Sequence, residues 1–137
     1  MNRLTVVLTG VLALAAATGV RAQLPQKYTN LQVLPKDIPP AQLVATMKGF
    51  AQGLGVRCEH CHVGEGNDLS KFDFAADTKP TKATARKMIR MASVLNAEVA
   101  TIVPPAADAS GAARVTCFTC HRGAQKPLTA PGGGGAP

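Results

Sequence analysis

The chain has 137 residues, a length that suits one domain and is too short for a two-domain enzyme. It contains only one Tyr, four Phe and no Trp, which is little aromatic surface for a core built from side chains alone. The net charge is +7, but the basic residues are scattered and aromatic residues for base stacking are nearly absent, which argues against a nucleic-acid-binding protein. The composition indicates a small protein whose own side chains are too few to complete a hydrophobic core.

The N-terminus has the pattern of an export signal. Arg3 gives a short positive start, and the 17 residues of Leu4–Val20 carry no charge. Small residues at Val20 and Ala22 predict cleavage after Ala22, so that residues 1–22 form a signal peptide. A membrane-spanning helix needs about 20 apolar residues, so a retained anchor is the less favoured alternative. Export predicts a location in the periplasm or on the outer face of the cytoplasmic membrane, with membrane contact only through a partner or a retained anchor.

The mature domain, residues 23–126, is predicted to begin with an extended arm over residues 23–36 and a first helix after it. Pro39-Pro40 suits a helix start, and Gly53 and Gly55 can end the helix. Its apolar residues recur at helical spacing and form one stripe. The members of that stripe are Leu43, Met47, Phe50 and Leu54.

A second helix is predicted between Pro80 and Pro104-Pro105, because proline is tolerated in the first turn and stops a helix at its end. The basic residues of this segment, among them Lys82 and Arg86, lie mostly off its apolar stripe. The stripe consists of Met88, Met91, Leu95, Val99 and Ile102. Residues 127–137 are Pro-, Gly- and Ala-rich and are expected to be a disordered tail. The sequence therefore predicts a mainly α-helical protein with extensive loops.

All four cysteines belong to two copies of one pattern, C-x-x-C-H, which is the attachment pattern of haem c. Two thiols three positions apart can reach the two vinyl groups of one porphyrin, and the histidine that follows can place its imidazole on the iron. The two copies are Cys58-Glu59-His60-Cys61-His62 and Cys117-Phe118-Thr119-Cys120-His121. The sequence thus predicts two covalently bound haem c groups, each attached to a turn that follows a helix.

Other interpretations of the cysteines explain less. Disulfides give no reason for a histidine after each pair. A zinc site of the C-x₂-C…C-x₂-C type usually has about 15–20 residues between its pairs, whereas 55 separate Cys61 from Cys117. A thioredoxin-like redox pair needs a βαβ context, which the sequence does not show.

Two haems would supply the apolar surface that the composition lacks. Phe72 and Phe74 are expected to pack on a haem. Arg122 is a candidate partner for a propionate, since guanidinium pairs bidentately with carboxylate, and a solvated Arg122 is equally compatible with the sequence. His60 is expected to be a surface residue.

The sixth iron ligands would decide the function, because a methionine thioether closes the iron and raises its reduction potential. The spacing offers Met47 for the first haem and either Met88 or Met91 for the second. A methionine on an apolar helical stripe is also a common core filler, so spacing leaves the choice open.

Four segments of the chain resemble the cytochrome c subunit of the photosynthetic reaction centre. They are Asn30–Leu34, Met47–His62, Ala85–Asn96 and Val115–Gly123. The resemblance covers roughly residues 28–125 and implies that Met47 and Met88, with Met91 as a substitute for Met88, are the distal ligands opposite His62 and His121. That subunit carries four haems as two pairs, whereas this chain has one pair, and no histidine stands near Ile102, where the family has a further ligand.

The favoured interpretation is an exported dihaem cytochrome c that carries electrons to or from redox protein partners in a photosynthetic reaction centre or a respiratory complex. It is not expected to be an enzyme. The first alternative is a dihaem enzyme of the peroxidase or nitrite reductase type, which would need one open haem site. The second alternative is a structural zinc or disulfide module.

Overall fold

A computed structural model describes residues 28–103 and 113–130. The signal peptide at residues 1–22, the Pro104-Pro105 stop and residues 131–137 of the tail lie outside the described residues. Within the described ranges the chain forms helices and loops and has no strand, only an isolated bridge between Val63 and Asp73. The prediction of a mainly α-helical protein is confirmed. The elements are α1 (Pro40–Leu54), η1 (Cys58–His60), η2 (Leu69–Lys71), α2 (Pro80–Ile102) and α3 (Cys117–His121).

Helix α1 begins and ends where its local sequence dictates. Pro40 occupies the first turn, where its missing N–H costs no hydrogen bond. Gly55 closes the helix in the left-handed conformation, with φ of 63°, and its N–H bonds to the carbonyl of Gln52 at 3.3 Å. Gly53, the other predicted terminator, lies inside the helix instead. It is buried, and a Cβ there would come within 2.8 Å of the Cβ of Cys117. The absence of a side chain at Gly53 therefore allows α3 to lie close to α1.

Helix α2 begins at Pro80, as predicted, but its apolar stripe is largely uncovered. Met88, Met91, Leu95 and Ile102 are 37%, 47%, 40% and 74% exposed. Lys82 lies off this stripe, as expected, but the face it occupies is packed, and Lys82 is buried at 7% exposure.

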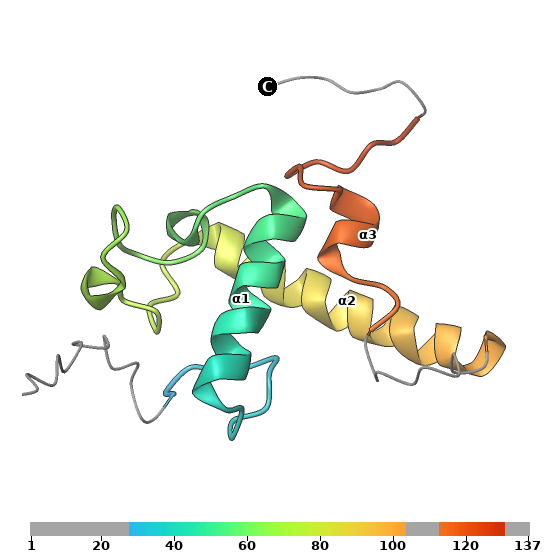
Figure 1. Cartoon of the computed structure of the whole chain (residues 1–137), viewed down its shortest axis with the longest axis horizontal. Coiled ribbons are helices and arrows are strands. Elements are labelled where there is room, and N and C mark those ends of the chain that lie inside the picture. Colours follow the sequence, from blue (N-terminus) through green and yellow to red (C-terminus); the bar gives the residue numbers. More distant parts are fainter. Residues whose placement is uncertain (1–27, 104–112, 131–137) are drawn as a thin grey trace, which may run out of the picture.

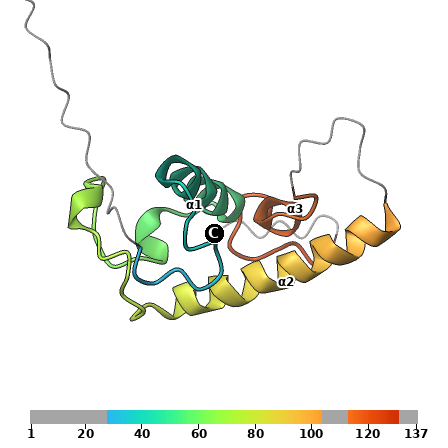
Figure 2. The same cartoon turned by 90° about the horizontal axis from the view of Figure 1, so that it is seen from below.

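The three helices form an open arrangement. Helix α1 crosses α2, and the short α3 lies beside α1 (Figure 1). Figure 2 shows α2 as a long base with α1 and α3 on one side of it. Helices α1 and α3 are in direct contact, and the Gly123 N–H that follows α3 bonds to the carbonyl of Gly53 at 3.0 Å. None of the helices within the described ranges is long and apolar enough to cross a membrane.

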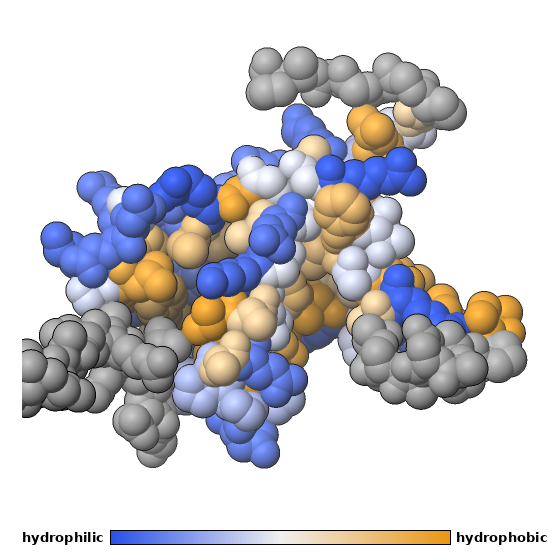
Figure 3. Space-filling view, in the orientation of Figure 1, coloured by the Kyte–Doolittle hydropathy of each residue, from blue (hydrophilic) through white to orange (hydrophobic). Residues whose placement is uncertain are grey.

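The protein buries little of its own surface. Among the described residues only Ile38, Gly53, Phe72 and Lys82 are buried, and no large side chain there is fully buried. Figure 3 shows apolar side chains at the surface between α1 and α3 and at the C-terminal end of α2. Apolar faces that the chain does not cover are what a protein built around a large apolar group would present.

Candidate functional site

Each cysteine pair lies on one helical turn that begins at its first cysteine. Cys58 opens η1, and its carbonyl accepts hydrogen bonds from the N–H groups of Cys61 at 3.2 Å and His62 at 3.0 Å. Cys117 opens α3, which runs to His121. Each turn thus carries two cysteines and one histidine within five residues of backbone.

The second turn is capped by its own sequence and fastened to α2. The hydroxyl of Thr119 accepts a hydrogen bond from the N–H of Thr116 at 2.9 Å, as part of a capping box. The side-chain amide of Asn96 donates to the carbonyl of Val115 at 2.7 Å and accepts from the N–H of Val115 at 2.9 Å. This double hydrogen bond places the segment leading into Cys117 against the middle of α2. No motif in the sequence predicted this contact.

The imidazole of His121 is held in the form that binds a metal. Its Nδ1 lies 3.0 Å from the carbonyl oxygen of Ala124. A carbonyl can only accept, so Nδ1 must donate, and in a neutral imidazole Nε2 is then left with a free lone pair. A second hydrogen bond of this kind commonly orients a metal-ligating histidine.

The imidazole of His62 lies in an aromatic pocket. Its ring meets Phe74 edge to face, with centroids 5.1 Å apart at 71°, and Phe74 stacks on Phe72 at 5.4 Å. Its Nδ1 is buried without a hydrogen-bond partner. Burial, and next to it the positive charge of Lys82, lowers the pKa of His62. The ring is therefore neutral at neutral pH, as an iron ligand must be. Of the two phenylalanines that were expected to pack on a haem, Phe74 thus contacts the predicted ligand, and Phe72 stacks on Phe74.

The cysteines do not form the environment of a thiolate metal site. None of the four forms a disulfide, and the described residues contain no group of three or more side chains placed to hold a metal ion. Burial raises the pKa of Cys61 and of Cys117. Burial thus favours the neutral thiol form of both residues.

A mostly apolar cavity of about 700 Å³ lies between α1, α2 and the second cysteine turn. Its size is in the range of small-molecule and cofactor sites. A Cβ at Gly49, which faces it, would meet no atom within 4 Å. Cys117, whose thiol is a predicted haem attachment point, is part of the wall. The lining residues include Val33, Phe50, Ile89, Ala92, Val115 and Cys117.

The other predicted site residues are less organised in the described structure. Met47 is half-buried, whereas Met88 and Met91 are exposed, and none of the three lines this cavity. Arg122 is exposed and is the only non-glycine with positive φ among the described residues, at 50°. His60 is half-buried and borders a separate hollow of about 270 Å³.

The chain is similar to known cytochromes. A family model described as "Photosynthetic reaction centre cytochrome C subunit" matches residues 7–130. The photosynthetic reaction center cytochrome c subunit of Rubrivivax gelatinosus is 41% identical over 88 residues, which cover 60% of this chain and 23% of that protein. The corresponding subunit of Thermochromatium tepidum is 32% identical over 124 residues, covering 86% of this chain and 26% of that protein.

A further relative is cytochrome c-554 of Chloroflexus aurantiacus, 35% identical over 100 residues, which cover 72% of this chain and 21% of that protein. The chain thus spans about a quarter of the length of these curated relatives. No solved structure matches it. The match of the family model along most of the sequence confirms the resemblance seen in the motifs: the chain belongs to the family of photosynthetic reaction centre cytochrome c subunits.

Proposed function

We propose that the chain is an exported dihaem cytochrome c that carries electrons. One haem c would be held by Cys58, Cys61 and His62. The second would be held by the matching set on α3, namely Cys117, Cys120 and His121. The observation that carries the proposal is that each C-x-x-C-H motif is wound on a single turn, which holds both cysteines and the histidine within five residues of backbone. Membership of a cytochrome c family implies covalently bound haem c, and two motifs support a count of two.

The residues around the two turns fit this cofactor. His121 has Nδ1 committed to the Ala124 carbonyl, and His62 is kept neutral by burial. The apolar cavity beside Cys117 offers room for part of a porphyrin. When bound, each haem supplies a one-electron iron couple. The chain's own part is to hold the imidazoles, exclude water with apolar walls and fill the remaining iron positions.

We assign those remaining positions to Met47 on α1 and Met88 on α2, as the family pattern implies. A thioether opposite each imidazole leaves no open site for a substrate, which suits an electron carrier rather than an enzyme. The partners we propose are redox proteins on the outer side of the membrane, either a membrane-bound photosynthetic or respiratory complex or a soluble carrier. The relatives' names, which are those of reaction centre subunits, support this class of partner.

A haem count tests the proposal directly. The pyridine haemochrome assay should give two haems per chain, and Cys58→Ala or Cys117→Ala should each lower the count by about one. His60→Ala is the control within the first motif, because His60 is not assigned to the iron, and it should keep both haems and an unchanged visible spectrum. A wild-type chain without haem would rule out the proposal. A high-spin component in the spectrum would indicate an open iron and favour a dihaem enzyme.

A further inference from the structure

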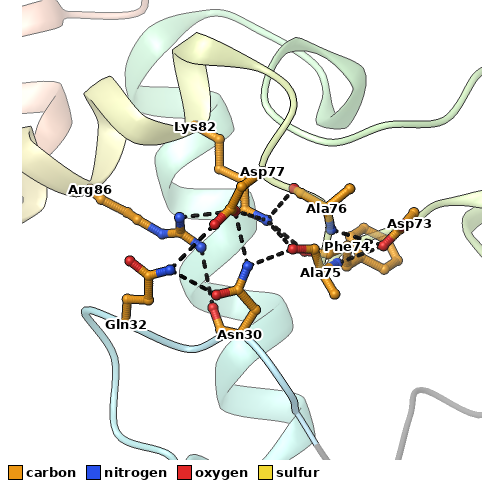
Figure 4. Close-up of polar contacts among 9 residues, drawn as sticks. All are labelled: Asn30, Gln32, Asp73, Phe74, Ala75, Ala76, Asp77, Lys82 and Arg86. Atoms are coloured by element: carbon orange, nitrogen blue, oxygen red, sulfur yellow. Dashed lines mark hydrogen bonds and ion pairs between the residues drawn. The ribbon is translucent and has the colours of Figure 1, made fainter.

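A buried lysine lies next to the first cysteine turn. The Nζ atom of Lys82 donates to three consecutive carbonyl oxygens, those of Phe74 at 2.9 Å, Ala75 at 3.2 Å and Ala76 at 2.6 Å (Figure 4). It also pairs with Oδ1 of Asp77 at 3.0 Å. Four oxygens around one ammonium hold the charged form of Lys82 in place, because only paired charges are stable when buried.

The same carboxylate is shared by a second cation. Nη1 of Arg86 lies 2.9 Å from Oδ1 of Asp77, and Nδ2 of Asn30 donates to the same oxygen at 2.9 Å. The guanidinium of Arg86, and next to it the amide of Asn30 and the ammonium of Lys82, hold the pKa of Asp77 well below its usual value. Asp77 is therefore ionised at neutral pH. Lys82 and Arg86 carry two positive charges against the one negative charge of Asp77. These three residues and Asn30 form a cluster with a net positive charge.

The cluster reaches His62 through Phe74. Phe74, whose carbonyl is held by Lys82, packs its ring edge to face on the imidazole of His62 at 5.1 Å. Lys82 is thus separated from the imidazole by one residue, Phe74, and its positive charge lies close enough to act on an iron bound to His62.

We propose that Lys82 is a positioning residue for the first haem, resting on the proposed function above: it fixes Phe74 against His62, and its charge raises the reduction potential of the iron that His62 binds. The physical reason is Coulombic. The ferric state carries one more positive charge than the ferrous state, so a fixed ammonium nearby disfavours the ferric state. Removing the ammonium makes the iron harder to reduce, and removing the carboxylate that offsets it makes the iron easier to reduce.

Three variants of the full dihaem chain test this, with both midpoint potentials measured by redox titration. Lys82→Met removes the charge and keeps the length of the side chain. We expect it to lower the reduction equilibrium constant of one haem by about tenfold, which is about 59 mV for a one-electron couple, and to leave the other haem unchanged. Asp77→Asn should shift the same haem in the opposite direction. Lys87→Met is the control, because it removes the same charge from an exposed position on the same helix, and it should move neither potential by a comparable amount.

The signs of the two shifts in reduction potential distinguish an effect of the Lys82 charge from a purely structural role of Lys82. If Lys82 only stabilised the loop, Lys82→Met and Asp77→Asn would both loosen it and shift the potential in the same direction, and that result would overturn the inference. A shift for Lys82→Met no larger than for Lys87→Met would overturn it as well. If Lys82→Met does not take up haem, Asp77→Asn decides, since its upward shift is expected from the charge alone. A haem count below two in the wild type contradicts the proposed function itself, whereas two haems without opposite shifts contradict only the role of Lys82.

Discussion

Two methionines on α2 compete for the second iron, and helix geometry separates them. Met88 lies four residues before Ala92, which lines the apolar cavity, so the two share one side of the helix. Met91 is only one residue from Ala92 and lies about a quarter-turn or more away from that side. Position on the helix therefore favours Met88, the residue that the family resemblance also implies.

The weak absorption band of ferric Met–His haem, near about 700 nm, measures these ligands. If each iron has one methionine, Met47→Ala and Met88→Ala should each reduce the band by roughly half, because each variant opens one iron. Met91→Ala is the matched control on α2 and should hardly change it. Loss of half the band in Met91→Ala but not in Met88→Ala would move the ligand one turn along α2. No loss in either would mean that the second iron has another ligand.

Asp77 makes the stability of the protein depend on pH in the acid range. Its pKa lies below its unfolded value of 3.8, so the folded state binds fewer protons than the unfolded state. The stabilisation is complete above about pH 4 and is lost as the pH falls through the lowered pKa. Thermal unfolding of the holoprotein should thus show a falling midpoint temperature below about pH 4, with a flatter curve for Asp77→Asn.

The control for this measurement is Asp37→Asn, an exposed carboxyl outside the cluster. It should leave the fall of the midpoint temperature below about pH 4 as steep as in the wild type. Asp77→Asn should keep part of this fall, because hydrogen bonds from Ser70 also lower the pKa of Asp68. Equal slopes for Asp77→Asn and the wild type would show that the cluster around Asp77 does not contribute to folding.

At the scale of the elements, the contact between α1 and α3 depends on one missing side chain. A Cβ at Gly53 would lie 2.8 Å from the Cβ of Cys117 and 2.9 Å from the backbone nitrogen of Phe118. Overpacking of this kind costs about 1–3 kcal/mol, and the gain in helix propensity from glycine to alanine is about 1 kcal/mol. Gly53→Ala should therefore lower the free energy of unfolding by up to about 2 kcal/mol, measured by urea denaturation.

Gly49→Ala is the matched control on the same helix. A Cβ at Gly49 meets no atom within 4 Å, so the substitution should gain about 0.5–1 kcal/mol of helix propensity and cost nothing in packing. Opposite signs for the two glycines would locate the α1–α3 contact at Gly53. A loss at both positions would contradict that view and would indicate that a bound group approaches Gly49.

The elements that could be predicted from the sequence are those determined locally. The starts of α1 and α2 follow from Pro40 and Pro80, and the end of α1 follows from the left-handed Gly55. Gly53 was misread as a helix end, because its role depends on Cys117, which lies far away in the sequence. The burial of Lys82 could not be predicted either, because its partners are backbone carbonyls. Every residue has such a carbonyl, so no sequence pattern indicates which of them a lysine will contact.

The candidate site also has a part that local sequence indicates and a part that depends on tertiary contacts. The assignment of the cysteine and histidine residues to haem rests on the sequence alone and stays a prediction, because covalent attachment of a porphyrin requires a fixed spacing within five residues. The environment of each histidine could not be predicted, since it depends on how a turn meets its neighbours. Ala124 orients His121 through a carbonyl, and Phe74 packs on His62 from the far side of a loop.

At the scale of the whole molecule, the described chain lacks the core that a free-standing helical domain of this size would need. No large side chain in the described ranges is fully buried, and the apolar stripe of α2 is open to solvent. Burial of apolar surface is the main favourable contribution to folding, at about 25 cal/mol per Å². Most of the stability of a helix in a protein comes from tertiary packing. Under the proposed function, the fold therefore depends on the haems that the two cysteine turns would attach.

A chain that cannot attach haem should then be unfolded, rather than keep its fold with the haem sites empty. A variant with all four cysteines changed to alanine should lose most of its helical signal in far-ultraviolet circular dichroism and show no cooperative thermal transition, because too little apolar surface is buried to offset chain entropy. A variant of one motif provides a graded control: Cys117→Ala/Cys120→Ala should keep the first haem and lose chiefly the helical signal of the long α2, whose cavity-lining face it leaves bare. A cooperative unfolding transition in the four-alanine variant, with helix content equal to that of the holoprotein, would show instead that side chains alone hold α1, α2 and α3 together. The molecule would then be a preformed scaffold for its cofactors, and Asn96 and Gly53, which join the second turn to α2 and α1, would be its main supports.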